Sequence, residues 1–333
     1  MDDRLAQALA FVESNRDEME RWLARLVEVN SYTGNPDGGR EVGAMLRELL
    51  EGPDLRCEVH ASERFADHLV FSTPAQGKPI ALVGHLDTVF PPGTFEGYRQ
   101  EGNIARGPGV LDMKGGLVVA GFGLLALRKV GVLERLPLRF VIVGDEEVGS
   151  PESQPLLRES CRDAQAALVF EAGRAHDAII TRRKGTGGMK ATAHGKAAHA
   201  GALHHEGINA IWALARVIDA AQKLTDYARG VTVNVGKISG GQGKNTVPDR
   251  AEAELDIRFT TAEDGERLVA SLHEAASEAA ASIPGASIAL EGGMMRAPLE
   301  KSEASAALYA EYAACARASG LGDGEAPLIG GGS

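Results

Sequence analysis

Cysteine is scarce in this sequence and is not spaced for cross-linking. The three cysteines, Cys57, Cys161 and Cys315, are far apart in a chain of 333 residues and form no C-x-x-C pair. A disulfide framework or a thiolate zinc site needs more cysteines at closer spacing. We therefore expect reduced, mostly buried thiols in a reducing compartment.

Long apolar runs and an excess of basic charge are also missing. No stretch is apolar over the ~20 residues that a membrane-spanning helix needs, and the acidic, amphipathic residues 1–22 do not resemble a secretory signal. The 46 acidic residues outnumber the 35 Lys and Arg, which gives a formal net charge of -11 and disfavours binding to nucleic acid. We expect a cytoplasmic protein that binds neither nucleic acid nor membrane.

The first part of the chain alternates short apolar runs with helical patterns. Apolar runs lie at residues 67–72, 79–84 and 138–143, and helical patterns lie near residues 3–30 and at 115–130. Strands alternating with helices of this length predict an α/β fold, with a mixed, largely parallel sheet between helices. The composition is that of a globular protein, and the length favours two domains.

A different order of elements follows. Strands are predicted at residues 187–195, 231–239, 251–259 and 286–292. The helix after the first strand has an apolar face made of Ile208, Ile211, Leu214, Val217, Ile218 and Leu224. A second helix begins at a capping box formed by Thr261 and Asp264. The order strand, helix, strand, strand, helix, strand predicts an inserted ferredoxin-like α+β domain over about 177–293.

Polar residues follow the predicted strands of the first part, where open α/β sheets bind ligands. His85 and Asp87 stand two positions apart in ALVGHLDTVF, so their side chains emerge on the same face if the strand continues. Such a carboxylate can orient a metal-bound imidazole. Asp112 lies between an apolar pair and a Gly-Gly helix start. Taken alone, Asp112 is more simply an N-cap residue.

The stretch GDEEVGS places two glutamates after a buried strand. Consecutive side chains diverge, so of Glu146 and Glu147 one can bind metal while the other acts as general base. The pattern does not decide which, and a solvated acidic loop is the alternative; Asp145 is interpreted as a turn residue. A further strand ends at Glu171. One imidazole with several carboxylates fits two zinc ions, or another divalent metal such as cobalt or manganese.

The order of six motifs resembles that of the M20 metallopeptidases, and the glutamate carboxypeptidase branch of that family in particular. These motifs are HLDTV, GVLDMKGG, GDEEVGS, FEAG, GKAAHAG and NTVPDRAEAELDIRF. The resemblance implies a catalytic domain in two parts, residues 1–176 and 294–333. It also implies that residues 177–293 form a domain that serves as a lid and as the interface of a homodimer.

The resemblance assigns roles to the polar strand ends. It implies that the zinc ligands are His85, Asp112, Glu147 and Glu171. Asp112 is then the residue that bridges the two ions, and the peptide bond after it is cis. Glu146 is the general base, and Asp87 orients His85.

Further roles fall in the inserted domain. The resemblance implies that His199 reaches the partner subunit's active site to stabilise an oxyanion, and that Arg258 and Asn245 bind the terminal carboxylate of the substrate. From the residues alone, Arg258 can equally form a salt bridge on its strand, and His199 can be a solvated loop histidine. Lys114 and Arg183 are weaker candidates for substrate contact.

The last residues, LIGGGS, are typical of a strand that enters a tight loop. Family members continue beyond this point with a histidine that completes one metal site, so we expect the second metal site, and hence the activity, to be incomplete in this chain. The expected reaction is amide hydrolysis of small peptides or N-acyl amino acids with a free α-carboxylate, with C-terminal glutamate favoured. The alternatives are an N-acyl amino acid deacylase and a non-catalytic dimeric binding protein.

Overall fold

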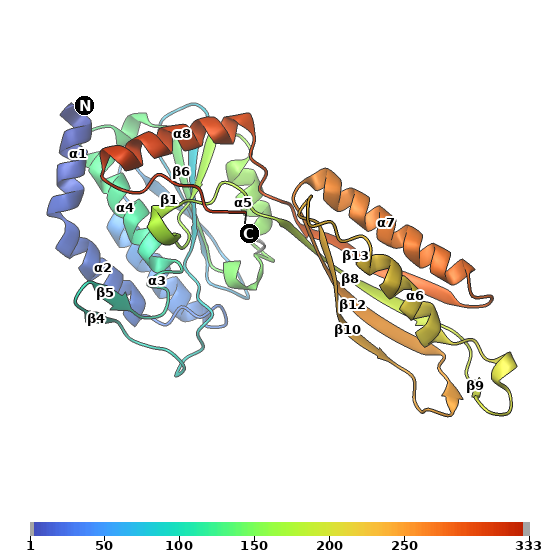
Figure 1. Cartoon of the computed structure of the whole chain (residues 1–333). Coiled ribbons are helices and arrows are strands. Elements are labelled where there is room, and N and C mark those ends of the chain that lie inside the picture. Colours follow the sequence, from blue (N-terminus) through green and yellow to red (C-terminus); the bar gives the residue numbers. More distant parts are fainter. Residues whose placement is uncertain (1–2, 329–333) are drawn as a thin grey trace. The chain divides into compact units, whose positions relative to one another are not determined.

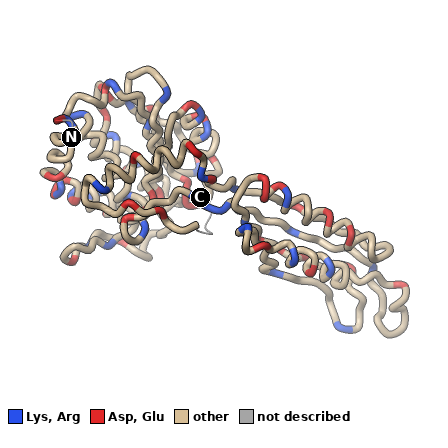
Figure 2. The backbone as a smooth tube through the Cα atoms, turned by 45° about the horizontal axis from the view of Figure 1, so that its top comes forward, with Lys and Arg blue, Asp and Glu red and all other residues tan. Residues whose placement is uncertain are grey.

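The computed structural model describes residues 3–328 and divides into two compact units (Figure 1). Unit 1 ends at Gly173 and unit 2 begins at Arg174. Acidic and basic residues are interspersed along both units (Figure 2). No helix within the described part of the chain has the length and apolar character needed to cross a membrane.

Unit 1 contains a five-stranded sheet and five α-helices. Its helices are α1 (Asp3–Ser14), α2 (Arg16–Glu28), α3 (Pro36–Leu50), α4 (Lys114–Lys129) and α5 (Gln154–Cys161), with 3-10 turns η1 (Leu133–Arg135) and η2 (Glu146–Val148). Its strands are β1 (Arg56–His60), β2 (His68–Ser72), β3 (Ile80–His85), β6 (Leu138–Val143) and β7 (Ala166–Val169), beside a small hairpin of β4 (Arg99–Glu101) and β5 (Ile104–Arg106). The predicted strands and the predicted helix at 115–130 are confirmed.

The sheet of unit 1 is mixed, as predicted. Its strand order is β1-β2-β6-β3-β7. The strands β6, β3 and β7 run parallel, whereas β1 and β2 pair antiparallel. Helices cover both faces, because apolar side chains of α2, α3 and α4 join one core cluster and those of α5 pack on Val141 and Val143 at the other face.

The N-terminal helical pattern is confirmed and is divided into two helices. The residues near 3–30 form α1 and α2, which are separated at Asn15. The side-chain amide of Asn15 donates a hydrogen bond of 2.8 Å to the carbonyl oxygen of Phe11. Such a side-chain bond competes with the backbone ladder and favours a break in the helix.

Parallel pairing brings the polar strand ends of unit 1 to one edge of the sheet. In the register of β3 and β6, His85 lies opposite Val143, and Leu86 then donates to the carbonyl oxygen of Val143 at 2.9 Å. The residues that follow both strands therefore leave the sheet side by side. β7 pairs with the other side of β3 and ends just before Glu171.

Unit 2 contains the predicted ferredoxin-like arrangement. Its strands are β8 (Gly185–His194), β10 (Thr232–Gly240), β12 (Arg250–Phe259) and β13 (Ser287–Arg296), with the short pair β9 (Ala198–His199) and β11 (Thr246–Val247). Its helices are α6 (Ala210–Gln222), α7 (Ala262–Ala281) and α8 (Glu303–Ala318), with 3-10 turns η3 (Ala175–Asp177) and η4 (His204–Glu206). The antiparallel order is β10-β12-β8-β13.

Local details of unit 2 mostly follow the predicted patterns, although Ile208 and Leu224, which were expected on the helix face, lie outside α6. The hydroxyl of Thr261 accepts a hydrogen bond from the backbone N–H of Asp264 at 3.1 Å, so the predicted helix start is confirmed. Leu214 and Val217 on α6 are buried. Ile211 was expected on the same apolar face but is 39% exposed. The sequence pattern alone overestimates how much of the helix circumference is buried, because one sheet covers only part of the helix surface.

The cysteines are free, but the expectation of mostly buried thiols is wrong: Cys57 and Cys161 are half-buried and Cys315 is exposed.

The assignment of 294–333 to the catalytic domain stays a prediction, as do the boundaries at 177 and 293. The predicted strand-to-loop transition at LIGGGS falls almost wholly outside the described residues, which end at Leu328.

Helix α4 touches the strand end that carries Glu171, and this contact gives a testable prediction. A Cβ on Gly116 would lie 1.9 Å from the carbonyl oxygen of Phe170, whereas a Cβ on Gly123 of the same helix meets nothing within 4 Å. We expect Gly116→Ala to lower the free energy of unfolding by about 1–3 kcal/mol through overpacking. Gly123→Ala should raise it by about 0.5–1 kcal/mol. Urea denaturation measures both, and a stabilised Gly116→Ala protein would contradict the close approach.

Candidate metal centre

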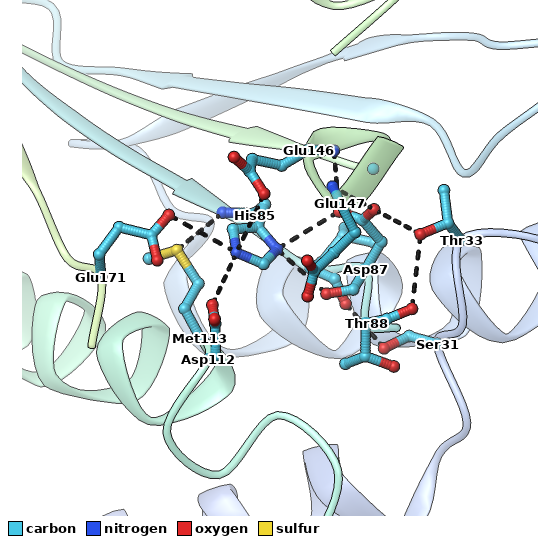
Figure 3. A network of polar contacts seen from close by, with 12 residues as sticks. Ser31, Thr33, His85, Asp87, Thr88, Asp112, Met113, Glu146, Glu147 and Glu171 are labelled. Carbon is cyan, nitrogen blue, oxygen red and sulfur yellow. Dashed lines mark hydrogen bonds and ion pairs between the residues drawn. The ribbon is translucent and has the colours of Figure 1, made fainter. Parts of the chain in front are cut away.

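His85 is the centre of a cluster of acidic side chains at the carboxyl end of β3 (Figure 3). The side chain is 1% exposed. Its Nε2 lies 3.1 Å from Asp112 Oδ1, 3.6 Å from Glu171 Oε1 and 3.9 Å from Glu146 Oε2. These carboxylates come from three separate segments, so the parallel sheet and α4 together create the cluster.

The other ring nitrogen of His85 is held by Asp87. Nδ1 lies 3.0 Å from the backbone oxygen and 3.3 Å from Oδ1 of Asp87. This contact places the Nδ1 proton toward Asp87 and directs Nε2 toward the other carboxylates. A histidine oriented in this way is the usual form of a metal ligand.

Asp87 also holds the turn η2. Its Oδ1 accepts the backbone N–H of Glu146 and its Oδ2 accepts that of Glu147, both at 3.2 Å. The hydroxyl of Thr33 donates to Oδ2 at 2.8 Å. One buried carboxylate, 1% exposed, thus fixes the imidazole of His85 and the two glutamates relative to each other.

Asp112 reaches the cluster from the start of α4. The peptide bond between Asp112 and Met113 is cis. The buried Met113 places its sulfur 3.1 Å from the backbone nitrogen of His85. Two independent contacts therefore link the start of α4 to the end of β3.

The cluster contains two overlapping groups that could hold a metal ion. His85, Glu146 and Glu171 form one group, and His85, Asp112 and Glu147 form the other; the ligand atoms within each group all lie within 4.8 Å of one another. Among the described residues, Glu146, Glu147 and Glu171 form no ion pair with a lysine or arginine. One imidazole and several carboxylate oxygens suit zinc or a similar divalent ion, so the residues present fit such a metal.

Crowding and burial shift the pKa values of these groups. Burial, followed by repulsion from neighbouring carboxylates, raises the pKa of Glu147 to about 7 despite the attraction of His85. Burial also raises the pKa of Glu171. For His85, burial acts to lower the pKa, but hydrogen bonds to Asp112 and Asp87 outweigh it and raise the pKa to about 11. Without a cation, the imidazole therefore retains a proton that a metal would displace.

Comparison with known proteins finds similarity to M20 peptidases. A family model described as a peptidase dimerisation domain, M20_dimer, matches residues 181–284. Carboxypeptidase G2 of Pseudomonas sp. (strain RS-16) is 30% identical over 264 residues, which cover 77% of this chain and 63% of that protein. Residues 181–284 therefore match the M20 peptidase dimerisation domain, and the chain is similar in sequence to carboxypeptidase G2. It spans less than two thirds of that relative's length.

Other M20 proteins resemble this chain in sequence or in fold. A probable succinyl-diaminopimelate desuccinylase of Staphylococcus aureus (strain Mu50) is 26% identical over 277 residues, covering 71% of this chain and 67% of that protein. The crystal structure of the aminopeptidase PepT from Bacillus cereus has a TM-score of 0.80 at 23% identity, covering 96% of this chain and 86% of that one. The M20 metallo-carboxypeptidase Sso-CP2 from Sulfolobus solfataricus has a TM-score of 0.68 at 17% identity, covering 95% and 87%.

The candidate residues of this chain divide between the two units. His85, Asp87, Asp112, Glu146, Glu147 and Glu171 come together in unit 1, whereas His199, Asn245 and Arg258 lie in unit 2. The geometry does not distinguish a ligand from a base among the glutamates, because Glu146 also belongs to one of the possible ligand groups. The roles assigned to all nine residues stay predictions.

His199 and Asn245 are neighbours in unit 2. His199 pairs with Thr246 in the β9–β11 ladder, and the backbone oxygen of Asn245 accepts the N–H of Ala200 at 2.9 Å. Nδ1 of His199 accepts the N–H groups of Gly201 and Ala202 at 3.2 and 3.1 Å. Because Nδ1 accepts, a neutral His199 carries its proton on Nε2. The exposed ring can therefore donate one hydrogen bond to an anionic oxygen.

Two basic candidates for substrate contact, Arg258 and Lys114, already bind other groups of the protein. The guanidinium of Arg258 forms a two-pronged pair with Asp256 on the same strand, with both contacts at 2.8 Å, as the alternative interpretation of Arg258 expected. The suggestion that Lys114 contacts substrate is wrong. Lys114 is fully buried, and its Nζ donates to the carbonyl oxygens of Leu26 and Val29 at 2.9 and 2.8 Å. Burial lowers its pKa to about 7.

Thr33 and Met113 were missed by the sequence analysis. Thr33 lies in the loop after α2, and its hydroxyl contacts Asp87, which is 54 positions away in the sequence. Met113 adjoins Asp112, but nothing in its type signals a contact with the backbone of His85. Only the tertiary structure shows that both residues support the cluster.

Asp87→Asn tests how far the cluster depends on this carboxylate. An amide offers one acceptor oxygen, so either the Glu146 or the Glu147 N–H would lose its partner, and the charge beside His85 would be lost. We expect zinc affinity, measured by competition with a chelator, to fall about 10–100-fold. Asp163→Asn, in an exposed pair with Arg139, is the control and should leave the affinity unchanged. Equal affinities for both variants would contradict the role of Asp87.

Metal binding should release protons. His85, with its pKa of about 11, and Glu147, with its pKa of about 7, must both be deprotonated to act as ligands. Below pH 7 both protons are displaced, together with any proton that burial keeps on Glu171; above pH 7 Glu147 is already ionised and fewer protons are displaced. Apparent affinity therefore rises with pH, and more steeply below pH 7. Calorimetry in buffers of different ionisation enthalpy counts these protons, and zero release at pH 6 would contradict the ligand set.

Proposed function

We propose that this protein is a two-metal hydrolase, with zinc as the preferred ion, that cleaves the amide bond of a small peptide or N-acyl amino acid with a free α-carboxylate. The observation that carries the proposal is the convergence of His85 with Asp112, Glu146, Glu147 and Glu171, in which no lysine or arginine pairs with the three glutamates among the described residues. The similarity to carboxypeptidase G2 and the match to the M20 peptidase dimerisation domain support the reaction class.

The residues proposed to hold the metal are His85, Asp112, Glu147 and Glu171. A divalent ion held there would supply Lewis acidity, which would polarise the amide carbonyl and make water a stronger acid. The Nδ1 contact with Asp87 keeps Nε2 of His85 directed into this cluster.

Glu146 is the proposed general base. Its side chain is 33% exposed, so water and substrate can reach it, and its backbone is fixed by Asp87. Its carboxylate accepts a proton from the attacking water while the new C–O bond forms. It then gives this proton to the amide nitrogen as the C–N bond breaks, which yields a carboxylic acid and an amine.

Residues of unit 2 are proposed to bind the substrate. The Nε2 proton of His199 can donate to the developing oxyanion, and Arg258 with Asn245 can bind the α-carboxylate. We propose that His199 acts in the active site of a second copy of the chain. The match of residues 181–284 to a peptidase dimerisation domain supports a homodimer.

Two substrate classes remain candidates within this reaction. C-terminal glutamate is preferred because FEAGR and GKAAHAG resemble the glutamate carboxypeptidase branch and because carboxypeptidase G2 is 30% identical. An N-acyl amino acid deacylase is the alternative, supported by the probable desuccinylases among the relatives. Hydrolysis of C-terminal-glutamate dipeptides, compared with N-acetyl and N-succinyl amino acids, separates the two.

Glu146→Gln tests the mechanism. The amide cannot accept the proton of water, so we expect kcat on the preferred substrate to fall about 10²–10⁴-fold while zinc still binds. Glu159→Gln, exposed on α5 and paired with Arg162, is the matched control and should behave like the wild type. A wild-type protein that binds no metal and cleaves no member of the panel would overturn the proposal in favour of a binding protein.

A further inference from the structure

A second buried histidine lies next to the segment that carries Glu146 and Glu147. His68 begins β2 and is 5% exposed. The ladder between β2 and β6 ends at the pair Leu69–Ile142. Beyond it, the backbone N–H of Gly144 donates to Nδ1 of His68 at 3.2 Å. The imidazole of His68 thus supplies the acceptor that the backbone of a paired strand would otherwise provide.

Gly144 lies in close contact with the segment before β2. A Cβ at this position would lie 2.7 Å from the carbonyl oxygen and 3.0 Å from the Cβ of Ala66. The N–H of Gly144 is therefore enclosed by protein, and a buried N–H without a partner is costly. The ring of His68 supplies that partner two residues before Glu146.

The loop that follows is attached to the same segment at a second point. Asp145 is completely buried, and its Oδ2 accepts the N–H groups of Glu152 and Ser153 at 2.8 and 3.1 Å. The carboxylate of Glu152 accepts a hydrogen bond of 2.6 Å from the hydroxyl of Ser62. The loop 144–153 is therefore held between contacts with His68 and Ser62 at one side and with Asp87 at η2.

The contact with Gly144 determines the protonation of His68. Nδ1 can accept this N–H only if it carries no proton, so His68 is neutral with its proton on Nε2. Burial, the largest influence, lowers the pKa of His68 against the raising effects of Asp145 and Glu152. The environment thus favours the same neutral form that the hydrogen bond requires.

We propose that His68 is a positioning residue, whose Nδ1 fixes the N–H of Gly144 and thereby the backbone direction that places Glu146 and Glu147 beside His85. The step from backbone position to metal binding and catalysis rests on the proposed function. Replacing a residue that orients metal ligands typically lowers metal affinity or activity about 10–100-fold.

Two substitutions of His68 separate this role from simple space filling. Asn places its side-chain oxygen near the position of Nδ1 and can accept from Gly144, whereas Gln extends toward the position of Nε2 and cannot. We expect His68→Gln to accelerate hydrogen exchange of the Gly144 amide at least about tenfold and to weaken zinc binding about 10–100-fold. His68→Asn should restore both toward the wild type.

His60→Gln is the matched control, because His60 lies directly opposite His68 on the neighbouring strand β1. His60 is partly exposed and contacts Glu58, and its substitution should leave exchange and affinity unchanged. In a turnover assay, His68→Gln should lower kcat and leave KM near the wild-type value, since the proposed substrate-binding residues are untouched.

Three outcomes would overturn the proposal: equal effects of Asn and Gln, wild-type exchange at Gly144 in His68→Gln, or a His68 ring protonated on Nδ1. The ¹⁵N chemical shifts of the ring report the tautomer in the wild type, so this measurement does not depend on the folding of any variant. If the wild type binds no zinc, the proposed function fails, while the tautomer and the exchange at Gly144 still decide whether His68 holds the loop.

Discussion

The candidate site depends on one buried negative charge, that of Asp87. A carboxylate that is 1% exposed is stable only when its oxygens are well satisfied. Here two backbone N–H groups, a threonine hydroxyl and an imidazole surround it. Because these partners come from three segments, the requirement to satisfy Asp87 also sets the positions of His85 and of the turn η2.

Within the described residues, the same arrangement gathers the carboxylates of Asp87, Asp112, Glu146, Glu147 and Glu171 around the single imidazole of His85. Burial, with repulsion between these carboxylates, raises the pKa values of Glu147 and Glu171. A divalent cation would remove that repulsion and convert the cluster into a set of ligands. Metal binding and the stability of unit 1 should therefore be coupled.

Sequence periodicity predicted most of the framework. The strands of unit 1, the ferredoxin-like order of unit 2 and the cap at Thr261 followed from local patterns, and polar residues at strand ends indicated the cluster around His85. The break at Asn15, the burial of Lys114 and the contact of Thr33 with Asp87 could not be predicted. The break at Asn15 depends on a local side-chain hydrogen bond, and the other two features depend on residues distant in the sequence. Neither kind of contact leaves a periodic signal in the sequence.

The division of the chain has a consequence for its evolution and for protein engineering. All six residues of the cluster lie between positions 85 and 171, whereas the match to the dimerisation domain occupies 181–284. The two stretches do not interleave. A recombination event near residue 175 would therefore exchange the stretch that matches the dimerisation domain without dividing the candidate metal ligands described here.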